Sequence, residues 1–119
     1  MKGGIMTENW CTPKPKLTEQ PLLDMGNAEG LSETFKILSN GTRLRILHTL
    51  IRIPNLSVSE VTKQLKMKSQ AISNQLQRLV DKGIVRNNRE GNFIRCRIVD
   101  NCVVSLLDQG WCLTEDLPK

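Results

Sequence analysis

A change in the spacing of apolar residues at Gly83 constrains the fold of this chain more than any other feature. Before this glycine, apolar residues recur three or four positions apart, which predicts a helix from Ser69 up to Gly83. After it the spacing is two, which predicts strands over residues 84–88 and 93–99 around REGN, whose glycine suits a hairpin. The buried stripe of the helix is expected to be Ile72, Leu76, Leu79 and Val80.

A second short helix is predicted just before this one. Ser57 and Glu60 have the S-x-x-E spacing of a capping box, so a helix of about residues 57–65 is expected to begin there. Residues 66–68, KMK, separate the two helices and are too few for anything but a tight turn. Two short helices joined in this way form a helix-turn-helix unit, and the hairpin would lie beside it as a wing.

Two helices are predicted before this unit and one after it. Residues 28–39 form an amphipathic pattern, Asn40 is expected to cap the next helix, and Pro54 to end it. That helix is expected to bury Leu44, Leu47, Leu50 and Ile51. A last helix is expected to begin near Asp100. The fold class is therefore mainly α with a small β-hairpin, a winged helix-turn-helix in the order α-α-α-α-β-β-α.

The length of 119 residues suits one domain with a modest core. Residues 1–27, with three prolines and no periodicity, are expected to be a mobile arm, residues 28–113 the domain, and residues 114–119 a tail. No apolar run is long enough to cross a bilayer, and the start lacks the apolar section of a secretory signal. We therefore expect a soluble cytoplasmic protein.

Positive charge is concentrated in the middle of the chain. Residues 28–99 hold 13 Lys and Arg against 5 Asp and Glu, a net charge of +8. The first 27 residues are neutral, and residues 100–119 hold 1 basic residue against 4 acidic ones. This pattern is typical of a surface that binds a polyanion.

The outward face of the helix that begins at Ser69 suits the major groove of double-stranded DNA. Gln70 and Asn74 can each offer a donor and an acceptor to one base edge, and Ala71 can lie against a thymine methyl group. Lys68, Ser69 and Ser73 are placed for phosphates near the helix N-terminus. The residues expected to contact DNA are Lys68, Ser69, Gln70, Ala71, Ser73, Asn74, Gln77, Arg78, Arg86, Arg89, Arg95 and Arg97.

Other functions are less well supported. A polar helix face can be merely solvated, and a winged helix can be a protein-interaction module, so that alternative stays open. Base stacking on aromatic residues is disfavoured because the chain has two Trp, two Phe and no Tyr. An enzyme is not expected, because the chain has one histidine, no phosphate-binding glycine loop and no paired carboxylates.

Four stretches, FKILSNGTRLRILHTL, LSVSEV, ISNQLQRLVDKGIV and REGNFIRCRIVD, resemble the ArsR/SmtB family of bacterial winged-helix repressors over about residues 29–100. The resemblance implies a homodimer paired through its first and last helices, and repression that is released when an inducer binds. The two-fold symmetry of such a dimer predicts a pseudo-palindromic DNA operator with two half-sites. The resemblance places Gln70, Ser73 and Asn74 at DNA-reading positions and Arg97 at the usual wing arginine. The implied dimer interface includes Leu31, Phe35, Val103, Val104, Leu106, Leu107 and Trp111.

The sequence departs from the family at its metal sites. Members often carry a C-x-C pair on the helix entering the motif, where this chain has Ser57 and Ser59, and hydroxyls do not replace thiolates as ligands of soft metals. A zinc site of Asp and His on the last helix is also absent. The one histidine, His48, is expected to be a structural residue at the edge of the core, and Gly41 replaces a usual proline.

The cysteines remain as a candidate inducer site. No CxxC spacing occurs, and reduced thiols are expected. Cys96 alternates with two isoleucines, which favours a buried packing role for this cysteine. If the last helices pair antiparallel about Leu107, Cys102 of one chain lies level with Cys112 of the other, and Cys11 could reach either. We hypothesise that these thiolates bind arsenite or a soft metal ion, or that they form a disulfide on oxidation. Inert cysteines, and a regulator without a metal inducer, are the alternatives.

Overall fold

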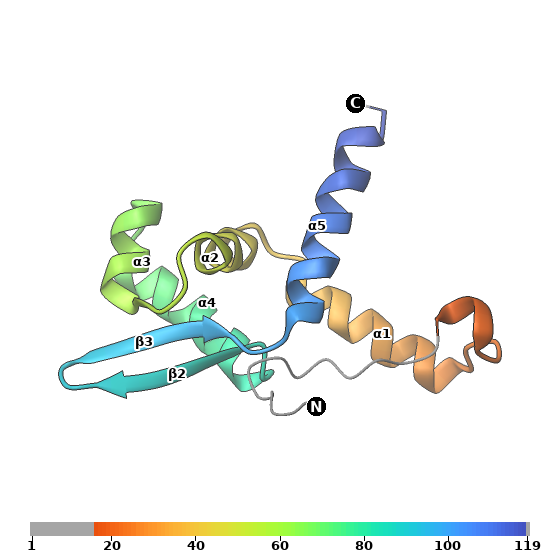
Figure 1. Ribbon diagram of the computed structural model, residues 1–119, viewed down its shortest axis with the longest axis horizontal. Helices are drawn as coiled ribbons and strands as arrows, with labels where there is room; N and C mark the ends of the chain where they lie inside the picture. Colours follow the sequence, from red (N-terminus) through yellow and green to blue (C-terminus); the bar gives the residue numbers. More distant parts are fainter. Residues whose placement is uncertain (1–15, 119) are drawn as a thin grey trace, which may run out of the picture.

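The computed structural model describes residues 16–118 and contains the expected winged helix-turn-helix (Figure 1). Within these residues a 3-10 turn, η2, precedes five α-helices and three strands. Their bounds are η2 Leu17–Glu19, α1 Met25–Leu38, α2 Gly41–Arg52, β1 Leu56–Ser57, α3 Val58–Leu65, α4 Ser69–Asp81, β2 Val85–Glu90, β3 Phe93–Ile98 and α5 Asn101–Asp116.

Polar side chains fix where the helices begin. Asn40 accepts a 3.0 Å hydrogen bond from the backbone amide of Arg43 at the start of α2, as predicted. The predicted capping box is confirmed: Ser57 Oγ accepts from the Glu60 amide at 3.1 Å, and Glu60 Oε1 accepts from the Ser57 amide at 2.8 Å. These bonds satisfy amides that the first turn of a helix leaves without partners.

Both outer helices extend beyond their predicted bounds. Asp24 caps α1 by accepting from the Asn27 amide at 2.8 Å, so the helix begins at Met25 and not at residue 28. At the other end, α5 continues to Asp116, so residues 114–116 belong to the helix and not to a tail. Residues 1–15 of the predicted arm lie outside the described residues.

The sheet contains one strand more than the sequence predicted. β2 and β3 form the expected antiparallel hairpin, with Gly91 in its turn at φ 60°. β1 pairs antiparallel with the other side of β3, with Leu56 opposite Cys96, which gives the strand order β1-β3-β2. Because β1 joins directly to α3, the wing is hydrogen-bonded to the start of the helix-turn-helix unit.

The core lies between α2, α3, α4 and the sheet. Ile46 and Leu47 of α2 are fully buried, whereas Leu44, predicted to be buried, is 37 % exposed. The predicted stripe of α4 is buried apart from Val80, which is half-buried. The buried hydrophobic residues are Leu38, Ile46, Leu47, Leu50, Leu56, Val61, Leu65, Ile72, Leu76, Leu79, Val85 and Cys96.

The two outer helices contribute little to this core. α5 projects from the body and contains no buried residue, and α1 buries Leu38 alone (Figure 1). Leu31, Phe35 and Trp111 are 43 %, 49 % and 65 % exposed. The other residues expected at a dimer interface are half-buried: Val103, Val104, Leu106 and Leu107. No helix within residues 16–118 is both long and apolar enough to span a membrane.

Candidate nucleic-acid interface

The two faces of α4 differ as the sequence predicted. Its inner face is buried, and Gln70, Asn74, Gln77 and Arg78 are exposed on the outer one. The amide of Gln70 donates to Asn74 Oδ1 at 2.8 Å. This bond uses one donor and one acceptor, and the Gln70 carbonyl oxygen and an Asn74 amide hydrogen stay available for a base edge.

The N-terminal end of α4 is suited to a phosphate group. Lys68 occupies the cap position, and its side chain makes no cap hydrogen bond to the first amides of the helix. Lys68 and Ser69 are exposed, and Ala71 and Ser73 are half-buried. Open amides and the positive end of the helix dipole favour an anion here.

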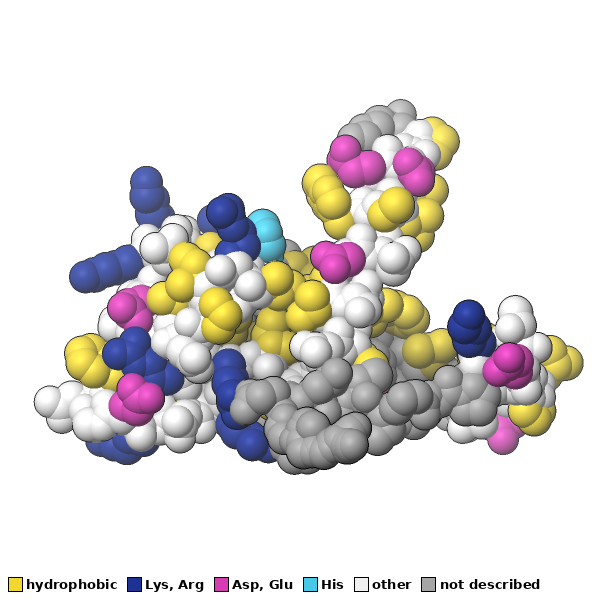
Figure 2. Space-filling view, in the orientation of Figure 1, with side chains coloured by type: hydrophobic (Ala, Val, Ile, Leu, Met, Phe, Trp, Pro, Cys, Tyr) yellow, Lys and Arg dark blue, Asp and Glu magenta, His cyan; other side chains and the backbone are white. Residues whose placement is uncertain are grey.

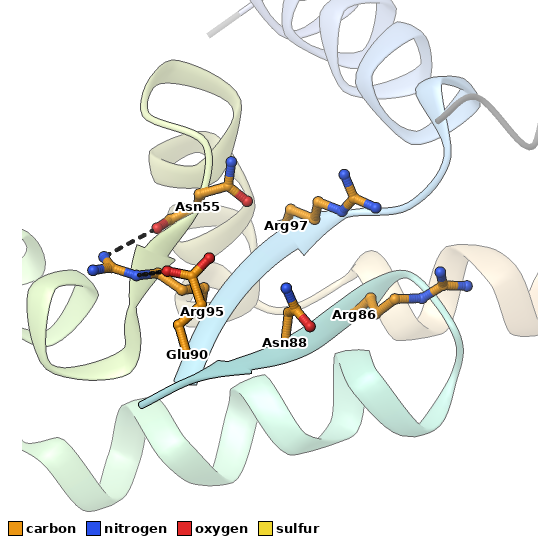
Figure 3. Close-up of a pocket in the computed structure, with 6 residues that line it drawn as sticks. All are labelled: Asn55, Arg86, Asn88, Glu90, Arg95 and Arg97. Carbon is orange, nitrogen blue, oxygen red and sulfur yellow. Dashed lines mark hydrogen bonds and ion pairs between the residues drawn. The ribbon is translucent and has the colours of Figure 1, made fainter. Parts of the chain in front are cut away.

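The wing carries arginines on both of its faces. Arg86 lies opposite Arg97, and Asn88 lies opposite Arg95. These four side chains share one face and, with Asn55 and Glu90, line a hollow of about 600 Å³ (Figure 3). Arg89 is exposed and, by alternation along the strand, lies on the other face. Figure 2 shows Lys and Arg side chains gathered mainly over the winged body, whereas the visible side of α5 is hydrophobic and acidic.

Protein groups surround Arg95, one of the predicted DNA contacts on the wing. Its guanidinium lies 2.9 Å from Glu60 Oε1 and 3.5 Å from Glu90 Oε1. It also lies 5.2 Å from the centre of the Phe93 ring. The backbone amide and hydroxyl of Ser57, and then the charge of Arg95, hold the pKa of Glu60 below its ordinary value. Arg95 therefore joins the wing to the first turn of α3.

A second anchored arginine was missed by the sequence analysis. Arg43 of α2 donates to Gln75 Oε1 of α4 at 2.7 Å and to the Ile37 carbonyl of α1 at 2.7 Å. No local sequence signal identifies this arrangement, because Arg43 and Gln75 are 32 positions apart and both belong to helices that are explained without them.

The cysteines occupy three different environments. Cys96 is buried, its thiol donates to Asn87 Oδ1 at 3.3 Å, and burial raises its pKa to about 11. Cys112 is an exposed free thiol. Cys102 is disulfide-bonded, so the expectation of reduced thiols is wrong for this residue. Cys11 lies outside the described residues.

The described residues offer no metal site within one chain. No group of three or more His, Cys, Asp or Glu in residues 16–118 is arranged to hold a metal ion. The hydroxyls of Ser57 and Ser59, at the family's C-x-C positions, lie 3.2 Å apart and bond to each other. His48 is exposed on α2 and not at the edge of the core as expected.

Known proteins with similar sequences and structures are transcriptional regulators. The sequence profile of the MarR family matches residues 40–92. The HTH-type transcriptional regulator NmtR of Mycobacterium tuberculosis is 33 % identical over 95 residues, which cover 80 % of this chain and 78 % of that protein.

Solved structures agree with this result. The antimony-specific transcriptional repressor AntR is 46 % identical, with a TM-score of 0.75 over 89 % of this chain and 96 % of the other. A homodimeric winged helix-turn-helix DNA-binding domain from Mycobacterium bovis, a possible ArsR-family regulator, is 25 % identical, with a TM-score of 0.69 over 84 % and 94 %. Together with the exposed polar face of α4 and the basic wing, these similarities show that the chain is a DNA-binding transcriptional regulator of the ArsR/SmtB family of winged helix-turn-helix repressors.

Proposed function

We propose that this protein is a cytoplasmic homodimeric repressor that reads a pseudo-palindromic operator through α4 and releases it when a thiophilic ion binds cysteine thiolates on α5. The observation that carries the DNA-reading part is the outer face of α4, where Gln70 and Asn74 are exposed while the opposite side is buried in the core. A rigid helix that presents amides in this way suits base readout in the major groove.

The apolar surfaces of α1 and α5 support the dimer. Leu31 and Phe35 on α1 and Trp111 on α5 are exposed in the single chain, although they are large apolar residues. A two-fold dimer that covers them places two copies of α4 on one side of the molecule, and two half-sites follow from that symmetry. The unit that binds DNA and dimerises then spans α1 to α5.

The spacing of the cysteines supports an inducer site that is shared between two chains. Cys102 and Cys112 are ten positions apart on α5, which corresponds to about 15 Å along a helix. One chain therefore cannot bring both sulfurs to one ion. Two antiparallel α5 helices bring Cys102 of one chain level with Cys112 of the other, and α5 does continue past Gly110 as this requires.

The chemistry of the donors selects the class of ion. Thiolate ligands prefer soft ions, and trivalent arsenic or antimony belongs to that class. The similar repressor at 46 % identity is antimony-specific, which supports the same class here. Cys102 must be in its reduced form to act as a ligand, whereas Cys96 is disfavoured because burial keeps its thiol protonated, with a pKa of about 11.

The disulfide at Cys102 favours a second candidate signal, a thiol oxidant. In that case oxidation of two thiols to one disulfide, with transfer of two electrons to the oxidant, would change the position of α5 without any metal ion.

The reduced full-length protein would be tested with a duplex that it selects from a random-sequence pool, with DNA affinity followed by fluorescence anisotropy. We expect a two-half-site sequence to be selected, and antimonite or arsenite to weaken its binding at least tenfold. Cys102→Ser and Cys112→Ser should bind DNA as before and lose this response, whereas Cys96→Ala should keep it.

The controls separate the parts of the proposal. Cadmium tests another soft ion, and diamide tests the oxidant. Binding without sequence preference would contradict the DNA-reading function. Sequence-specific binding that none of these reagents changes would contradict the inducer alone.

A further inference from the structure

We infer that Arg43 is a positioning residue that fixes the recognition helix α4 relative to α1, and so determines which separation of operator half-sites the dimer accepts. The inference rests on the proposed function for the dimer and its two-half-site operator. Its basis is one guanidinium that contacts two other helices: Nη1 donates to Gln75 Oε1 of α4 at 2.7 Å, and Nε donates to the Ile37 carbonyl of α1 at 2.7 Å.

The bonds from Arg43 to the end of α1 have an ordinary explanation. The last carbonyls of a helix lack partners within the helix, and arginine often satisfies them. Arg43 does so for α1 through Ile37 and, at 3.4 Å, through Lys36. This capping requires neither Gln75 nor α4.

The bond from Arg43 to Gln75 is not explained by helix capping. Gln75 lies in α4 between Asn74, which faces outward, and Leu76, which is buried. Two other side-chain hydrogen bonds of α4, Gln70 to Asn74 and Gln77 to Asp81, stay within the helix. The bond to Arg43 instead joins α4 to a residue that is itself fixed to α1.

The geometry of the Arg43 guanidinium is well suited to fix the angle between α1 and α4. A planar guanidinium donates in fixed directions, so two short bonds to different helices define both a distance and an orientation. Arg43 and Gln75 are both half-buried, which limits competition from water. Leu38, at the end of α1, is in the core, while the α1 surface that includes Leu31 and Phe35 is open to a second chain.

The consequence concerns two copies of α4. In a two-fold dimer paired through α1 and α5, the separation of the recognition helices depends on how each α4 is held relative to its own α1. A fixed separation matches one spacing of half-sites on the DNA, because each added base pair both moves and rotates the second half-site. A loose link would let one dimer accept several spacings.

The test compares Gln75→Met with Gln75→Glu. The methionine has nearly the same size and removes the oxygen that Arg43 contacts, while Arg43 still caps α1. The glutamate keeps an oxygen acceptor. Gln64→Met on α3, where Gln64 is exposed, is the matched control. Arg43→Met is informative only beside these variants, because loss of the α1 cap can unfold the protein.

The probes are the duplex that the wild-type protein selects from a random pool, the same duplex with one base pair inserted or deleted between its half-sites, and a duplex with a single half-site. We expect the wild-type protein, Gln75→Glu and Gln64→Met to bind the altered spacings at least about tenfold more weakly than the selected duplex. Gln75→Met should show less than about threefold discrimination, with single half-site affinity within twofold of wild type.

Two results would overturn the inference while leaving the proposed function intact. One is that Gln75→Met discriminates between half-site spacings as strongly as the wild-type protein does. The other is an equal loss of affinity for the single half-site and for every spacing, which would mean that Gln75 acts locally on α4. If the wild-type protein selects no duplex with two half-sites, the inference and the operator part of the proposed function both fail.

Discussion

Gln70 and Asn74 are hydrogen-bonded to each other on the outer face of α4, with 2.8 Å between the donating nitrogen of Gln70 and Oδ1 of Asn74. They lie one helical turn apart, and the bond holds both amides in defined positions before DNA arrives. Side chains ordered in advance lose less freedom on binding, so this bond would favour base readout by the pair if the proposed role of α4 is correct.

Replacing either amide should reduce sequence-specific binding. We expect Gln70→Ala or Asn74→Ala to weaken operator binding by about 1–3 kcal/mol and to leave binding to random duplex nearly unchanged. The double variant should cost less than the sum of the two losses, because each single variant also removes the bond between the amides. Anisotropy titrations on both duplexes measure this, and equal losses on both would show that these residues do not read bases.

Arg89 and Arg95 should differ in the salt dependence of DNA binding. Arg89 is exposed on the wing, whereas the guanidinium of Arg95 is paired with Glu60 and Glu90. We expect Arg89→Gln to lower the slope of log affinity against log salt by about one, since one phosphate contact is lost. Arg95→Gln should leave that slope unchanged and loosen the wing, which limited proteolysis can detect. A lower slope for Arg95→Gln would identify it as a phosphate ligand.

The buried thiol of Cys96 should make the protein less stable at alkaline pH. Burial raises its pKa from 9.0 to about 11, so the folded state retains a proton that the unfolded chain releases. The stabilisation is complete below pH 9 and is lost as the pH rises through 11, a change of about 2–3 kcal/mol.

Denaturant unfolding of the wild type and of Cys96→Ala between pH 8 and pH 11 tests this dependence. The alanine variant should be less stable at every pH because it lacks the packed sulfur and the bond to Asn87. The difference between the two proteins should shrink as the pH rises. A constant difference would mean that the thiol does not titrate differently in the folded state.

Glu60 should contribute stability that acid removes. The amide and hydroxyl of Ser57, followed by Arg95, lower the pKa of Glu60 below 4.5. Its contribution is therefore present above about pH 4.5 and is lost as the pH falls through the lowered value. Glu60→Gln should be less stable than the wild type at pH 7 and approach it at low pH. Glu90→Gln is the matched control, and a pH-independent difference for Glu60→Gln would contradict the assignment.

Local signals in the sequence were sufficient for much of the fold. The cap at Asn40 and the capping box of Ser57 and Glu60 depend on residues three positions apart, and both are present as predicted. Gly83 has a φ of 77°, a conformation that favours glycine, which explains why α4 ends just before it. The buried stripe of α4 followed directly from its period.

Features that depend on distant residues were missed. β1 has two residues, too few to show a period, and it exists because β3 lies beside it. The ion pair between Arg95 and Glu60 was also missed, because the two residues lie 35 positions apart. That Arg95 of the wing contacts DNA stays a prediction. Leu44 fitted the apolar spacing of α2, but the core covers the side of the helix that contains Ile46, and Leu44 is left exposed.

Because α5 has no buried residues in the single chain, its stability should depend on the concentration of the protein. Most of the stability of a protein helix comes from packing its apolar side, and in the single chain α5 leaves Trp111 and Leu113 in water. If a second copy covers them, assembly follows mass action and rises more steeply than the concentration of chain. The threshold for silencing a promoter would then be set by the rate of synthesis as well as by the affinity of a finished dimer for DNA.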